Sequence, residues 1–149
     1  MTIDAIVENS AAKKILIVDD ALSNEDFKAS IDVTIGKYCT QHGYQLDIVT
    51  SERDALSKIA QSTYDIVFTD GSLFSNHGNP DYSSGVHVAK AAKESKAYVV
   101  GISSQPKVFG ELAKDYLDIN YKKPFSIMTL IKIIEEKPSK EEFEKYDSR

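Results

Sequence analysis

Cysteine is nearly absent from the sequence, and the single residue of this type, Cys39, rules out a disulfide bond within the chain. This scarcity fits a reducing compartment, so we expect a cytoplasmic protein. Long apolar runs are also missing, and no stretch approaches the length of a membrane span. The first residues lack the basic start and apolar stretch of a secretion signal. We therefore expect neither a membrane protein nor a secreted one.

Concentrated positive charge is missing as well. The formal net charge is −5, and the closest approaches to a basic cluster are the pairs Lys13-Lys14 and Lys122-Lys123. Both pairs flank runs that look like strands, whereas binding to a phosphate backbone requires a concentrated positive face. The sequence therefore argues against direct binding to nucleic acid.

The length favours one domain. A chain of 149 residues can bury one proper core but leaves little room for a second. We expect a flexible lead over residues 1–12, a folded domain over 13–137, and a charged tail over 138–149 that is solvated or forms a frayed helix.

Two periodicities alternate along the folded part. A continuous apolar run predicts a strand at 13–19, and further strand-like stretches lie at 45–50, 64–70 and 97–103, with a weaker final strand at 118–122. Apolar residues at helical spacing predict helices at 24–39, 51–62, 86–95, 106–117 and 125–136. This order is (βα) five times. It indicates an α/β fold, doubly wound, with a five-stranded parallel sheet covered by helices on both faces.

Polar side chains gather where these strands end. Asp19 and Asp20 follow the first strand, Asp70 ends the third, Ser103 the fourth, and Lys123 follows the fifth. In an open parallel sheet these ends meet at one edge, where ligands bind. Three crowded carboxylates require a cation, and oxygen ligands without histidine or cysteine suit Mg²⁺.

That edge also suggests a reaction. A carboxylate beside a metal ion and an ammonium group can attack a phosphoryl group. The metal and Lys123 would then stabilise the negative charge of the transition state.

Four motifs in order carry a family resemblance. ILIVDD (15–20), YDIVFTD (64–70), VVGIS (99–103) and KKPF (122–125) resemble the receiver domain of two-component response regulators, over roughly residues 13–137. The resemblance implies a flavodoxin-like fold with strand order 2-1-3-4-5. It also implies that Asp19, Asp20, Asp70 and the backbone carbonyl of Ser72 hold Mg²⁺.

The same resemblance implies the phosphoryl chemistry. Asp70 corresponds to the phosphorylated aspartate, Ser103 to the hydroxyl that follows the phosphoryl group, and Lys123 to the lysine that pairs with it. The bond between Lys123 and Pro124 is usually cis in this family. The implied protein takes its phosphoryl group from a histidine kinase or a histidine phosphotransfer protein and is not a turnover enzyme.

Signalling would follow from contact with other proteins. The resemblance implies a downstream target that binds the face made by the fourth helix, fifth strand and fifth helix, and a homodimer is possible. We expect no attached output domain, because the sequence ends soon after the fifth predicted helix.

Some positions depart from the family pattern. Asn120 stands where the family commonly has an aromatic residue, three positions before the lysine. The loop 71–85 is long, Gly85 is the glycine that normally follows sooner, and Phe74 replaces a usual proline. The first helix also looks about two turns longer than usual.

The sequence also permits alternative interpretations. Asp20 could cap the next helix, Ser103 could be a plain loop hydroxyl, and Lys122 could take the place of Lys123. The whole protein could be a pseudo-receiver that binds partners without phosphorylation. It could also be a phosphatase like the haloacid dehalogenases, although that class needs a second acid where this chain has Ser72.

Overall fold

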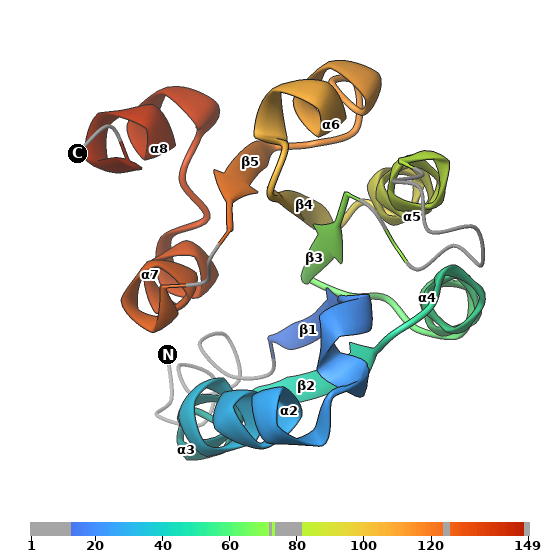
Figure 1. The fold of residues 1–149 in the computed structure, drawn as a ribbon. Helices are drawn as coiled ribbons and strands as arrows, with labels where there is room; N and C mark the ends of the chain where they lie inside the picture. Colours follow the sequence, from blue (N-terminus) through green and yellow to red (C-terminus); the bar gives the residue numbers. More distant parts are fainter. Residues whose placement is uncertain (1–12, 72, 74–81, 124–125, 148–149) are drawn as a thin grey trace, which may run out of the picture.

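The computed structural model describes residues 13–71, 73, 82–123 and 126–147. Its five strands form a single sheet (Figure 1). Their bounds are β1 Lys14–Val18, β2 Gln45–Val49, β3 Ile66–Asp70, β4 Tyr98–Ser103 and β5 Ile119–Lys122. All five lie within the stretches that the sequence predicted. The central strands β1, β3 and β4 are almost entirely buried, which is typical of a parallel sheet covered on both faces.

All neighbouring strands of this sheet run parallel, in the order β2-β1-β3-β4-β5. The α/β, flavodoxin-like fold and its 2-1-3-4-5 order are therefore confirmed. The register pairs Val18 with Thr69, Asp70 with Ile102, and Ser103 with Lys122. As a result, the carboxyl ends of β1, β3, β4 and β5 finish at nearly the same level.

Helices cover both faces of the sheet. The helical segments are η1 Asp20–Ser23, α2 Glu25–Ile31, η2 Asp32–Gly36, α3 Lys37–Gln41, α4 Glu52–Gln61, α5 Ser83–Glu94, α6 Pro106–Leu112, α7 Ile127–Glu136 and α8 Lys140–Asp147. In Figure 1, α2, α3 and α7 lie on one side of the sheet, and α4, α5 and α6 lie on the other. Each side has its own buried cluster, which includes Phe68 on the first side and Phe109 on the second.

The first predicted helix, 24–39, runs further and is not uniform. Asn24 caps it by accepting a hydrogen bond from the backbone of Phe27 at 3.0 Å. The helical path continues to Gln41 and widens into a π-helical turn, η2, between α2 and α3. Ile31, Ile35 and Cys39 remain buried through this turn, so it keeps the apolar face directed at the sheet.

The fourth predicted helix, 106–117, is shorter than expected, because α6 ends at Leu112. Turns carry the chain from there into β5. The carboxylate of Asp118 accepts hydrogen bonds from the backbone of Val99 at 2.7 Å and from the ammonium of Lys93 at 2.5 Å. These contacts hold the chain against β4, which a continued helix would prevent.

The C-terminal segment forms the helix α8. The sequence allowed a frayed helix here, but the side chain of Phe143 is only 3% exposed and belongs to the buried cluster under α7. The division at residue 137 stays a prediction, and the lead 1–12 lies outside the described residues. Within the described part of the chain, no helix combines the length and apolar character needed to cross a bilayer.

Candidate functional site

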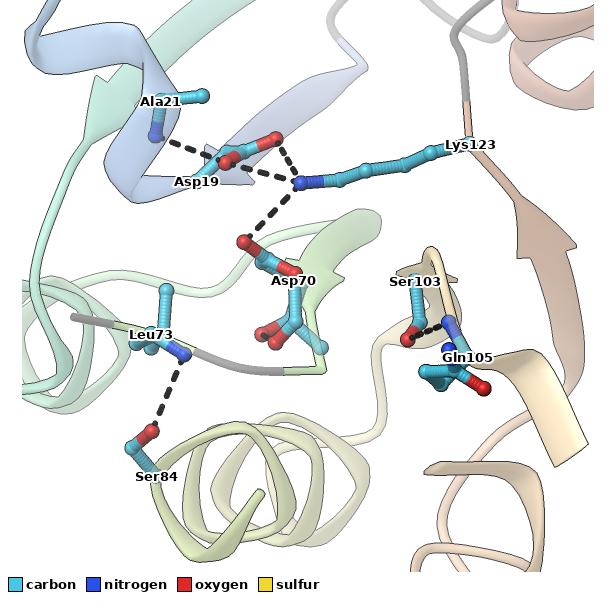
Figure 2. Close-up of polar contacts among 9 residues, drawn as sticks. Asp19, Ala21, Asp70, Leu73, Ser84, Ser103, Gln105 and Lys123 are labelled. Carbon is cyan, nitrogen blue, oxygen red and sulfur yellow. Dashed lines mark hydrogen bonds and ion pairs between the residues drawn. The ribbon is translucent and has the colours of Figure 1, made fainter. Parts of the chain in front are cut away.

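The polar strand ends meet as the sequence predicted. Figure 2 shows Asp19 after β1, Asp70 at the end of β3, Ser103 at the end of β4 and Lys123 after β5 at one edge of the sheet. The side chain of Lys123 extends across this edge, so that its nitrogen lies between the carboxylates of Asp19 and Asp70 (Figure 2). The site is therefore assembled from strands that are distant in sequence.

Asp19 is fully buried and has two roles for its two oxygens. Oδ1 accepts a hydrogen bond from the backbone of Ala21 at 3.0 Å and so caps η1. Oδ2 is buried without a hydrogen-bond donor, although the ammonium of Lys123 lies 3.2 Å away. One alternative interpretation made Asp20 the capping residue. The structure shows that Asp19 caps η1 instead.

The three acidic residues come close enough to share a metal ion. One carboxylate oxygen from each of Asp19, Asp20 and Asp70 lies within 4.8 Å of the others. All are hard oxygen ligands, and the buried Oδ2 of Asp19 has an unused acceptor, so the group fits Mg²⁺. The carbonyl of Ser72, predicted as a further ligand, lies outside the described residues.

Lys123 supplies the positive charge of the site. Its Nζ lies 3.1 Å from Oδ2 of Asp70 and 3.4 Å from Oδ1 of Asp19. Lys122 is exposed instead, and the backbone N–H of Lys123 bonds to the carbonyl of Ser103 at 3.0 Å. Lys123, and not Lys122, is therefore the lysine whose ammonium reaches the carboxylates.

The environment of Asp70 changes its acidity. The pKa of Asp70 is raised to about 7, first by burial and then by the neighbouring Asp19 carboxylate, while the Lys123 ammonium lowers it and so offsets part of the rise. Burial alone would lower the pKa of Lys123, but the two carboxylates raise it above its ordinary value. Lys123 therefore stays protonated at neutral pH, whereas Asp70 without a metal ion titrates near neutral pH.

Ser103 is buried beside this cluster. Its side chain is 2% exposed, and its hydroxyl oxygen accepts a hydrogen bond from the backbone of Gln105 at 2.9 Å. The hydroxyl proton remains available to another acceptor, because that bond uses only the oxygen. The site thus has a hydroxyl donor in addition to the lysine.

The backbone behind Asp70 is held by the start of α5. A Cβ atom on Gly85 would lie 2.4 Å from the carbonyl oxygen of Gly71 and 2.6 Å from that of Asp70. The hydroxyl of Ser84 accepts a hydrogen bond from the backbone of Leu73 at 3.3 Å. Sequence reasoning singled out Gly85 but missed Ser84, since a lone serine in a polar loop carries no periodic signal.

Asn120, at the position where an aromatic residue was expected, ties β5 to α6. Its side-chain N–H donates to the carbonyl of Pro106 at 2.6 Å. A Cβ on Gly101 would lie 2.9 Å from its Oδ1, and one on Gly110 would lie 2.7 Å from its Nδ2. The amide therefore fills the space that these two glycines leave between sheet and helix.

Several predicted features lie outside the described residues. They comprise the interior of the long loop with Phe74, and the bond between Lys123 and Pro124.

Comparison with solved structures identifies the fold, whereas no family model and no curated protein matches the chain. A CheY-like receiver domain from Methylobacillus flagellatus is 27% identical, covers 84% of this chain and 98% of its own, and superposes with a TM-score of 0.59. A CheY-like receiver domain from Methanospirillum hungatei is 24% identical, covers 85% of this chain and 94% of its own, and has a TM-score of 0.62. The response regulator TrrA from Thermotoga maritima, in complex with Mg²⁺ and BeF, is 22% identical, covers 83% of this chain and 96% of its own, and has a TM-score of 0.60.

The chain has the fold of a response regulator receiver domain. The resemblance seen in the four sequence motifs is thereby confirmed at the level of the fold. Within the receiver fold, the acidic residues, the serine and the lysine stand at the strand ends where the motifs placed them.

Proposed function

We propose that the protein is a response regulator receiver whose Asp70 accepts a phosphoryl group in a Mg²⁺-dependent reaction. The observation that carries the proposal is the contact of the Lys123 ammonium, at 3.1 Å, with an Asp70 carboxylate that also belongs to a three-acid cluster. A structural ion pair needs one acid, whereas three acids and one lysine leave an excess of negative charge that suits a divalent cation.

Asp70 performs the bond-forming step. An ionised oxygen of Asp70 attacks phosphorus, while the phosphorus–nitrogen bond of a phosphohistidine donor breaks and its electron pair stays on the imidazole nitrogen. Lys123 neutralises charge on the phosphoryl oxygens, and the Ser103 hydroxyl donates a hydrogen bond to one of them. Asp19, Asp20 and Asp70 would hold Mg²⁺, which would supply further electrostatic stabilisation of the negative charge.

Partners belong to the same proposal. The donor is a histidine kinase or a histidine phosphotransfer protein, and the readout is contact with a downstream protein on the face of α6, β5 and α7. The protein acts in the cytoplasm as a signalling switch rather than as a turnover enzyme, and a homodimer is compatible with this role.

A pseudo-receiver is the second candidate, and Asn120 favours it. An amide bonded to Pro106 replaces the aromatic residue that couples the site to the output face in relatives of the usual pattern. The complete acidic set and the buried Lys123 favour phosphorylation instead. A phosphatase like the haloacid dehalogenases ranks behind both, because Ser72 stands where its second acid would be.

Intact mass distinguishes these candidates. The protein is incubated with acetyl phosphate and Mg²⁺, beside Asp70→Asn and a control, Asp115→Asn, that changes an exposed carboxylate. A receiver gains one phosphoryl group in the wild type and the control, and none in Asp70→Asn. A wild type without gain is a pseudo-receiver, and many turnovers of released phosphate from added phosphomonoesters identify a phosphatase.

A further inference from the structure

The aromatic ring of Phe109, on α6, packs against the backbone that follows Asp70. Phe109 is completely buried. A Cβ atom on Gly71 would lie 2.7 Å from its Cγ and 2.8 Å from its Cδ2. Tyr82, just before α5, stacks on the same ring with centroids 6.5 Å apart and 26° between the planes. The ring therefore joins α6 and the start of α5 to the end of β3.

Two glycines make the space for this ring. Gly71 directly follows β3, and Gly101 lies in β4, where it pairs with Thr69 of β3. A Cβ on Gly101 would lie 2.9 Å from Cε2 of Phe109, and the three atoms nearest to one on Gly71 all belong to Phe109. Neither glycine has a φ in the left-handed region. At Gly71 the obstacle to a side chain is therefore the ring, and not the conformation of the backbone.

The peptide between Asp70 and Gly71 has further contacts on its other sides. The N–H of Gly71 donates to the carbonyl of Ile102 at 2.9 Å. The hydroxyl of Thr69 donates to the carbonyl of Asp70 at 3.2 Å. The backbone of Gly85 approaches the same carbonyl so closely that it leaves no room for a Cβ. With the ring in place, this peptide has no open space into which it could move.

The position of this peptide decides where the Asp70 carboxylate points. In the structure Oδ2 of Asp70 lies 3.1 Å from the ammonium of Lys123. A reacting group that is displaced by about 1 Å loses on the order of a hundredfold in rate, because the attacking atom no longer has a productive geometry. Removal of the ring would leave a space beside Gly71, and a shift of the backbone into it would move the carboxylate away from Lys123.

We propose that Phe109 is a positioning residue for the phosphoryl acceptor. Its ring fixes the peptide between Asp70 and Gly71 and thereby the direction of the Asp70 carboxylate. Phe109 acts through the backbone and not by contact with the phosphoryl group or the metal. The inference rests on the proposed function for its effect on reaction rate, while the placement of the peptide follows from the packing of Phe109 on Gly71.

An exchange of bulk between positions 71 and 109 tests the proposal. The rate of phosphorylation by acetyl phosphate at saturating Mg²⁺ is read from intact mass. We expect Phe109→Ala and Gly71→Ala each to be slower than the wild type by roughly tenfold or more. In the double variant the new Cβ at position 71 occupies part of the space of the ring. The Cβ of residue 109, 3.0 Å from it, remains and requires only a small shift of α6.

The sign of the second effect distinguishes positioning from a purely structural role. Phe109→Ala should slow the wild type but make Gly71→Ala faster, by roughly fivefold or more. Independent damage to a core adds up instead, so a double variant that is no faster than Gly71→Ala overturns the proposal.

Phe143→Ala is the matched control for the loss of an aromatic ring. Phe143 is 3% exposed and belongs to the cluster on the other face of the sheet. We expect its rate to stay within about twofold of the wild type, because additive effects are local. If Phe109→Ala does not fold, Phe109→Leu replaces it, with Phe143→Leu as its control. A rate of Phe109→Leu equal to that of its control overturns the proposal.

Hydrogen exchange of the Gly71 amide separates this inference from the proposed function. This N–H, bonded to Ile102, should exchange roughly tenfold faster or more in Phe109→Ala, or in Phe109→Leu where that variant replaces it, and keep its wild-type rate in the Phe143 control. Equal exchange in the wild type and the Phe109 variant refutes the positioning. A wild type that gains no phosphoryl group refutes the proposed function instead, and the exchange rates still decide the role of Phe109.

Discussion

The ammonium nitrogen of Lys123 lies 3.1 Å from Oδ2 of Asp70, across 53 positions of sequence. The contact links the end of β3 to the residue after β5 and spans the strand β4 between them. Since Asp19 also lies within 3.2 Å of the same nitrogen, one cation serves two buried carboxylates. This imbalance of charge is the source of the first two predictions below, on Asp70 and on Mg²⁺.

Asp70→Asn should stabilise the metal-free protein at high pH. Because the pKa of Asp70 is raised from 3.8 to about 7, the folded state keeps a proton that the unfolded state has lost between these values. The free energy of unfolding therefore falls as the pH rises through this window. We expect the free energy of unfolding of Asp70→Asn to exceed that of the wild type by about 1–2 kcal/mol at pH 8, and by much less at pH 4.

Urea denaturation with a chelator at both pH values measures this difference. Asp115→Asn, an exposed carboxylate, is the control and should leave the pH dependence unchanged. A wild type that is more stable than Asp70→Asn at pH 8 contradicts the assignment.

Mg²⁺ should raise the melting temperature more at pH 8 than at pH 6. The metal requires the ionised form of Asp70, and protons compete for this carboxylate below pH 7. Asp19→Asn should lose most of the shift and keep the fold, because asparagine also caps helices well. Thermal denaturation with and without Mg²⁺ provides the measurement, and a shift that is independent of pH or of Asp19 would exclude the acidic cluster as the metal site.

Gly85→Ala should damage the site, whereas Gly36→Ala should not. The added Cβ at Gly85 would meet the backbone of Gly71 at 2.4 Å, which no side-chain movement relieves. We expect Gly85→Ala to lower the free energy of unfolding by about 2 kcal/mol or more. We also expect it to abolish the rise in melting temperature that Mg²⁺ causes. At Gly36 the nearest atom lies 3.8 Å away and the backbone is helical, so alanine should stabilise by about 0.5–1 kcal/mol.

Urea denaturation of the two glycine variants provides the comparison. Equal stability of the two proteins would contradict the prediction, because it would show that α5 can move away from the backbone of Asp70 to make room for the added Cβ.

Asn120→Ala should weaken the attachment of α6. The carbonyl of Pro106 loses its donor, and the space between Gly101 and Gly110 is left unfilled. We expect a cost of about 1–2 kcal/mol in urea denaturation. Lys122→Ala, at an exposed position of the same strand, should cost little. Similar costs for both variants would mean that the amide has no structural role.

The sequence predicted the strands and the meeting of the polar strand ends well, since apolar runs that end in Asp19, Asp70 and Ser103 fix both the element and its level in the sheet. It could not predict the role of Asn120, because that role depends on the absence of side chains at Gly101 and Gly110, which are distant in sequence. The burial of Phe143 escaped it for a related reason. Two aromatic residues among charges, Phe143 and Tyr146, are too few to establish a periodicity, and the contact of Phe143 with Tyr121 exists only in the folded chain.

Localising the phosphoryl group tests the central claim most directly. The protein is treated with acetyl phosphate and Mg²⁺, reduced with borohydride, which converts an aspartyl phosphate to homoserine, and mapped by peptide mass spectrometry. We predict homoserine at position 70 alone, absent without Mg²⁺ and absent in Asp70→Asn. Homoserine at another aspartate, or none in a folded protein that has bound Mg²⁺, would contradict the account.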